Sequence, residues 1–85
     1  MNTITFRGCL TNPISPGGEI TLDVAVGGTT FHTLASGALA GVILDHLAEF
    51  APHTWVFVTG SIIDADNLRV QARHIAPDIS GNLEQ

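Results

Sequence analysis

The chain has 85 residues, which leaves room for one small domain with a single hydrophobic core and excludes two domains. Apolar residues make up 45% of the sequence and charged residues 13%, so the chain is too apolar and too weakly charged to be disordered. Eight acidic residues against three arginines and no lysine give a net charge of −5. This balance argues against a protein that grips nucleic acid mainly by neutralising phosphates.

Cysteine usage and hydropathy indicate the compartment. The single cysteine, Cys9, cannot form an intrachain disulfide and has no CxxC partner, so there is no zinc or redox signature. The uncharged stretch from Val24 to Leu44 is long enough for a membrane span, but glycines, hydroxyl residues and a histidine interrupt it. The N-terminus shows no signal-peptide pattern. We therefore expect a cytoplasmic protein with no membrane contact.

Alternating apolar residues predict three strands in the first part of the chain. The first strand is expected from Thr3 to Leu10, followed by a loop from Thr11 to Gly18 with two prolines and two glycines. The second strand is expected from Glu19 to Val26, where the alternation is most regular. Gly27-Gly28 is a two-residue hairpin signal, so Thr29 to Leu34 is expected to return antiparallel as the third strand.

The hydrophobic period changes from two to about 3.6 after Ser36, which predicts an amphipathic helix with Ser36 as its N-cap. The helix is expected to continue through Phe50 and to stop before Pro52. Its apolar face would consist of Leu39, Val42, Ile43, His46, Leu47 and Phe50.

Two further strands are expected after the helix. Thr54 to Thr59 alternates and should end before Gly60, and a turn is expected at Asp64 to Asn67. Leu68 to Arg73 predicts the fifth strand. The polar segment 77–85 has no period, so we expect an irregular, mobile tail after a domain that spans residues 1–76.

The expected order is three strands, one helix and two strands, each strand with one apolar face. This order predicts an all-β fold with one helix, namely an OB-fold, a five-stranded Greek-key barrel in which the helix between strands three and four plugs one end.

Four segments add a resemblance to this pattern. They are Asn2 to Leu10 followed by Asn12-Pro13, then Phe31-His32, Trp55 to Gly60, and Leu68 to Ile75. In this order they resemble the OB domain of bacterial single-stranded-DNA-binding proteins and their primosomal relatives over about residues 2–76. The resemblance implies a homodimer or homotetramer that binds single-stranded DNA in replication or repair. The chain departs from the family in its short last hairpin, its lack of lysine and its weakly acidic final residues.

The aromatic residues are the first candidates for a binding site, since exposed rings can stack on bases. Phe31 stands where the family places a stacking aromatic, and base stacking and ordinary packing are both open for it. Trp55 and Phe57 should point outward if Val56 and Val58 fill the barrel. An outward aromatic pair can contact a base or a second subunit, and we favour the subunit interface. We expect Phe6 to be core.

The only basic side chains are Arg7, Arg69 and Arg73, all expected on outer faces. They can form a strip that tracks phosphates, or they can be solvated edge residues paired with carboxylates, which we favour. Three arginines limit the log-log salt dependence of binding to a slope of about −2 per protomer.

Catalytic and metal-binding patterns are absent from the sequence. The four histidines show no HxH or HxxxH spacing, no serine or cysteine lies in a nucleophile motif, and the glycines form no nucleotide-binding loop. We expect no enzyme, no catalytic residue, no cofactor and no metal.

Two hypotheses remain. The first, which we favour, is a non-sequence-specific module for single-stranded nucleic acid, with DNA as the expected partner, that pools its few cations by oligomerisation. The second is an acidic OB-type interaction or oligomerisation module that has lost nucleic-acid binding and takes a protein partner. Under the first hypothesis the binding residues are Phe31, Trp55, Phe57, Arg7, Arg69 and Arg73.

Overall fold

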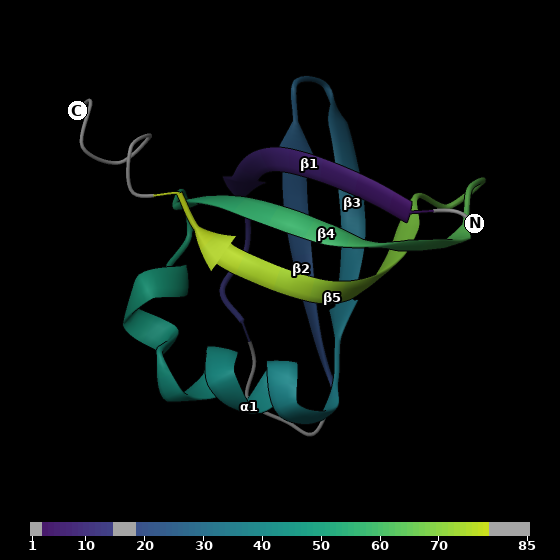
Figure 1. Ribbon diagram of the computed structural model, residues 1–85. Helices are drawn as coiled ribbons and strands as arrows, with labels where there is room; N and C mark the ends of the chain where they lie inside the picture. Colours follow the sequence, from purple (N-terminus) through teal and green to yellow (C-terminus); the bar gives the residue numbers. More distant parts are fainter. Residues whose placement is uncertain (1–2, 15–18, 79–85) are drawn as a thin grey trace.

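The computed structural model describes residues 3–14 and 19–78, and Figure 1 shows their arrangement. The described chain forms a closed barrel in the strand order β1-β2-β3-β5-β4. Neighbouring strands run antiparallel except β3 and β5, which are parallel. The strands are β1 (Thr3–Leu10), β2 (Ile20–Val26), β3 (Thr29–Ala35), β4 (Trp55–Asp64) and β5 (Arg69–Pro77).

Helix α1 (Gly37–Asp45) and a 3₁₀ helix (Leu47–Phe50) connect β3 to β4. They lie at the end of the barrel where β2 begins and β3 ends (Figure 1). Ala40 and Ile43 of α1 are buried and belong to the core that fills the barrel. The fold predicted from the element order, an OB barrel with its helix between strands three and four, is confirmed. No helix in the described ranges is long and apolar enough to cross a membrane.

The hairpin between β2 and β3 sets the register of the β2–β3 ladder. Gly27 has a φ of 63°, which favours glycine, and the turn pairs Val26 with Thr29. The same register places Val24 opposite Phe31. Because directly paired residues point to the same side of a sheet, and Val24 is fully buried, Phe31 faces the barrel interior.

Strand β4 is longer than the sequence indicates, because Gly60 does not end it. A Cβ at Gly60 would lie 2.3 Å from the backbone oxygen of Gln71, so the two strands approach each other where only glycine fits. The register shifts at this point, with Thr59 opposite His74 but Gly60 opposite Ala72. The extra residue of this β-bulge is Arg73, and both Arg73 and His74 are exposed.

The single helix expected from Ser36 to Phe50 is wrong in its extent, because α1 ends at Asp45. His46 leaves helical geometry with φ −129° and ψ 39°, and its backbone N–H donates to Ile43 O. The ring Nδ1 of His46 lies 2.9 Å from the carbonyl oxygen of Val42 and closes the helix end. The chain restarts as the 3₁₀ helix, which buries Phe50 in the core.

The apolar face of the helix is also narrower than expected. Val42 and Leu47 are exposed, whereas Leu39, Ile43 and Phe50 pack in or against the core. Ser36 is the N-cap residue, as predicted, but its side chain makes no capping hydrogen bond.

The barrel continues slightly beyond residue 76. Strand β5 includes Pro77, and Asp78 is buried with its backbone N–H donating to the carbonyl oxygen of Trp55 at 2.7 Å. The rest of the expected tail, residues 79–85, lies outside the described residues. So do residues 15–18 of the expected first loop, and Met1 and Asn2.

Candidate nucleic-acid interface

Two aromatic rings and one arginine form an outward patch on β1 and β4. Val56 and Val58 are fully buried, so Trp55 and Phe57 point outward as the alternation predicts, and Phe57 is 44% exposed. Arg7 lies opposite Phe57 in the β1–β4 ladder. Its guanidinium carbon is 4.4 Å from the centroid of the Trp55 ring, a cation–π contact. We call Arg7, Trp55 and Phe57 the β1–β4 patch.

Arg7 has a second partner. Its Nε donates to the carboxylate of Asp78, whose side chain is 2% exposed, while the side chain of Arg7 is 42% exposed. One guanidinium therefore contacts both the indole ring of Trp55 and a buried carboxylate. This pairing neutralises much of the positive charge in the patch and leaves a surface that is mainly aromatic.

Phe31 does not join the patch. Its ring is on the inner face of the sheet and stacks on Phe6, with ring centroids 4.6 Å apart and an interplanar angle of 25°. Both rings are half-buried, and Phe6 packs against the core. Phe31 therefore packs against Phe6, and it is less exposed than Phe57.

The three arginines do not form one continuous strip. Arg69 lies beside Asp64 in the β4–β5 ladder and beside His32 in the β3–β5 ladder. Arg73 sits further along β5, where its guanidinium donates to Thr3 Oγ1 at 3.3 Å. Arg69 and Arg73 therefore lie on β5, whereas Arg7 belongs to the β1–β4 patch.

The turn after β4 holds Asp64 in its charged form. Hydrogen bonds from the side chain and then the backbone of Asn67 are the main reason that the pKa of Asp64 lies below its usual value. Arg69 contributes a smaller attraction in the same direction.

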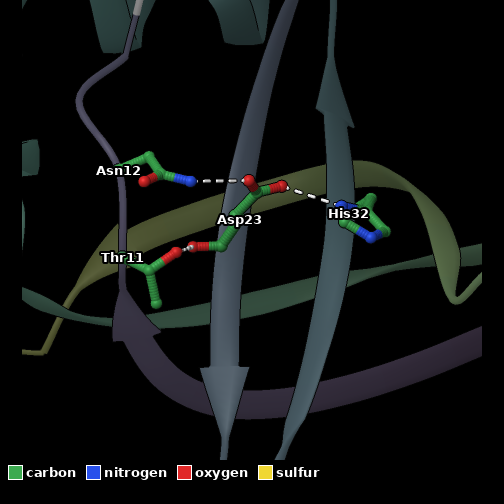
Figure 2. Close-up of polar contacts among 4 residues, drawn as sticks. All are labelled: Thr11, Asn12, Asp23 and His32. Atoms are coloured by element: carbon green, nitrogen blue, oxygen red, sulfur yellow. Dashed lines mark hydrogen bonds and ion pairs between the residues drawn. The ribbon is translucent and has the colours of Figure 1, made fainter.

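A polar cluster that joins β2 and β3 to the segment after β1 was not predicted from the sequence (Figure 2). Asp23 Oδ1 lies 2.9 Å from His32 Nδ1, and Asp23 Oδ2 accepts from Asn12 Nδ2 at 2.8 Å. Thr11 Oγ1 donates to the backbone oxygen of Asp23 at 3.3 Å. The signal was present, because a two-residue turn at Gly27-Gly28 pairs Asp23 with His32 on one outer face.

This cluster continues into a row of charged and polar side chains across four strands. The ladders pair Asp23 with His32, His32 with Arg69, and Arg69 with Asp64. We call these four residues the β2–β5 row. Neighbouring strands are about 4.8 Å apart, so the row spans roughly 15 Å of the outer surface.

The described residues contain no group of three histidine, cysteine, aspartate or glutamate side chains placed to hold a metal ion. No pocket is found in the same part of the chain. The candidate site in these residues is therefore an open surface with aromatic rings, arginines and hydrogen-bonding groups.

Comparisons with known proteins agree on the fold. The barrel superposes on a chain of the Replication Protein A heterotrimer bound to ssDNA, with a TM-score of 0.72 and 19% identity over 98% of this chain and 62% of that chain. It matches a chain of the S. pombe Stn1-Ten1 complex with a TM-score of 0.74 and 16% identity, over 99% of this chain and 65% of that one. The mitochondrial single-stranded DNA-binding protein Rim1 from S. cerevisiae gives 0.64 and 11%, over 89% and 92%.

These similarities define the class of this chain as an OB-fold domain. At identities below 20% they show the fold alone, and the chain spans just under two thirds of the first two matching chains. No protein-family model matches the sequence, and no match is found among curated proteins.

Proposed function

We propose that this protein is a binding module for single-stranded nucleic acid, with DNA as its main partner and no catalytic activity. The observation that carries the proposal is the β1–β4 patch, where Arg7 stacks on Trp55 beside the exposed ring of Phe57. Rings of this kind bind any base through its face, each contact contributing about 1–3 kcal/mol. Binding would therefore tolerate any sequence. Two of the structural neighbours are described as bound to ssDNA or as single-stranded DNA-binding, which supports this proposal.

Strand β5 provides a path for the nucleic acid. Arg69 lies at its start, Arg73 and His74 are exposed at its bulge, and Ala76 near its end pairs with Phe57 of the patch. From Arg69 to Ala76 the strand rises roughly 23 Å at about 3.3 Å per residue. A nucleic-acid strand laid along β5 would meet two cations first and the rings last.

Electrostatics would contribute little to this binding. Arg7 is engaged by Asp78, so Arg69 and Arg73 are the cations most open to phosphates. A homodimer or homotetramer that lines up several copies of β5 would multiply this small term, and we include such an assembly in the proposal. We place the function in the cytoplasm of a bacterial cell, in DNA replication or repair.

A second function is favoured by the Arg7–Asp78 contact. Because this contact leaves the patch nearly neutral and aromatic, the patch also suits a protein surface, either a second copy of the chain or another protein. Two of the matching chains come from protein complexes, the Replication Protein A heterotrimer and Stn1-Ten1. On this alternative the OB domain is an acidic interaction module.

Phe57 and Ile63 provide a matched pair of variants to separate the two functions. Both are large exposed apolar residues on β4, 44% and 52% exposed, but only Phe57 lies in the patch. Phe57→Ala should weaken the affinity for a labelled single strand, measured by fluorescence anisotropy, by about fivefold or more. Ile63→Ala should leave the affinity unchanged.

Sedimentation velocity of the same variants completes the test. If the wild-type protein shows no binding to single strands and Phe57→Ala dissociates an assembly that Ile63→Ala leaves intact, the interaction module is the correct function. Equal affinities of the two variants for the single strand would show that the β1–β4 patch is not part of the binding site.

A further inference from the structure

In the polar cluster at the start of the β2–β5 row, the carboxylate of Asp23 is oriented by two hydrogen bonds and can still accept others. Asp23 Oδ1 accepts from His32 Nδ1, because an ionised carboxylate can only accept, and Oδ2 accepts from Asn12 Nδ2 (Figure 2). Each carboxylate oxygen has two lone pairs, so each retains one acceptor position. The side chain of Asp23 is 27% exposed, which leaves the carboxylate accessible to a ligand.

The neighbours of Asp23 supply the other contacts that a nucleotide needs. The imidazole of His32 is 49% exposed and offers a face on which the neighbouring base of the strand can stack. Arg69 lies next to His32 in the ladder and is exposed, so its cation is available to a phosphate beside that base. One carboxylate, one ring and one cation thus lie on three adjacent strands, β2, β3 and β5.

The chemistry of the carboxylate selects among the bases. The Watson–Crick edge of a base is accessible in a single strand. Guanine presents two neighbouring donors on this edge, N1–H and N2–H₂, which match the two oxygens of a carboxylate. Cytosine and adenine each present one amino group beside an acceptor nitrogen. Thymine presents one N–H between two carbonyl oxygens, which a carboxylate repels.

We infer that Asp23, oriented by His32 and Asn12, is a base-reading site that gives the module a preference for guanine within a single strand. This inference rests on the proposed function and adds a compositional preference to a binding mode that otherwise tolerates any sequence. A bidentate contact of this kind discriminates by about fivefold or more against the wrong base.

The test uses labelled oligonucleotides of about 15 nucleotides, within the range one OB fold covers, built from repeats of d(TTX) with X as thymine, cytosine, adenine or guanine. The spacing keeps the guanines apart. A fifth oligonucleotide replaces guanine with inosine, which lacks only the N2 amino group. Affinities are measured by anisotropy for the wild-type protein and for Asp23→Asn. Asp45→Asn, the same change of charge on the exposed side of α1, is the matched control.

The expected result is about a fivefold or greater preference of the wild-type protein for the guanine repeat over the thymine repeat. Inosine should remove most of this preference, Asp23→Asn should abolish it, and Asp45→Asn should leave it unchanged. The inosine comparison needs only the wild-type protein, so it tests the site even if Asp23→Asn folds poorly.

Two contrary results have different meanings. Tight but equal binding of all five oligonucleotides, or a guanine preference that survives Asp23→Asn, would overturn the base-reading site and leave the proposed function standing. If none of the oligonucleotides binds, the proposed function fails and the inference fails with it.

Discussion

Arg7 donates from Nε to the carboxylate of Asp78, a residue 71 positions further along the chain. The contact ties the end of β5 to the middle of β1 at the place where the Asp78 backbone also bonds to β4. Asp78 is 2% exposed, so its charge depends on such partners. Arg7 therefore helps to close the barrel. The same contact makes its guanidinium less available to a phosphate.

Arg7→Ala should lower the free energy of unfolding by about 1.5–3 kcal/mol, since a hydrogen bond to a buried charge is lost. Arg73→Ala is the control, because the guanidinium of Arg73 donates to an exposed hydroxyl, that of Thr3, and its loss should cost about 0.5 kcal/mol or less. Urea denaturation of the two variants measures both values. Equal small losses would show that the Arg7–Asp78 pair contributes nothing measurable to stability.

Thr33 carries a hydroxyl in the barrel interior, where it is 0% exposed and has no hydrogen-bond partner among the described residues. Burying an unsatisfied hydroxyl is unfavourable, so Thr33→Val should raise the free energy of unfolding by about 1 kcal/mol. Thr21→Val, on the exposed face of β2, should change it by less than about 0.5 kcal/mol. A loss of stability in Thr33→Val would mean that the hydroxyl has a partner in solution.

Gly60→Ala should destabilise the barrel by about 1–3 kcal/mol, because the added methyl group would meet the backbone of Gln71 at the β-bulge. Gly28→Ala is the control, since a Cβ there meets no atom within 4 Å. Thermal unfolding followed by circular dichroism compares the two. Similar melting temperatures for both variants would contradict the close approach of β4 and β5.

The lowered pKa of Asp64 gives a pH dependence of known sign. A carboxyl group whose pKa is lower in the folded state stabilises the fold at neutral pH, and this contribution is lost as the pH falls through the lowered pKa. Asn67→Ala removes the main cause, so the pKa of Asp64 should rise toward its usual value in an NMR titration. An unchanged Asp64 titration in Asn67→Ala would show that the turn does not hold the carboxylate as described.

The sequence predicted the parts of this protein that depend on local patterns. Alternation placed Trp55 and Phe57 outside and Val56 and Val58 inside, and the order of elements predicted the barrel. The extent of the helix was wrong because apolar spacing continues across His46, where the backbone leaves helical geometry.

Contacts between distant segments were the parts that local patterns could not predict. The partner of Arg7 is 71 residues away and has no sequence signal. The Asp23–His32 pair, in contrast, follows from the register of the Gly27-Gly28 hairpin, and the same register points Phe31 inward, which is the packing role that the sequence left open beside base stacking.

Trp55 allows the most direct test of single-strand binding, because the only tryptophan of the chain lies in the β1–β4 patch. Oligo-dT and a random single strand are titrated into the protein at low salt while Trp55 fluorescence is followed, and salt is then added. We expect a saturable change with a log-log salt slope of about −1.4 per protomer, the value for two phosphates at about −0.7 each. The slope should fall toward zero in the double variant Arg69→Ala with Arg73→Ala. An unchanged fluorescence signal, together with flat anisotropy of labelled DNA up to high protein concentration, would contradict strand binding by this OB-fold domain.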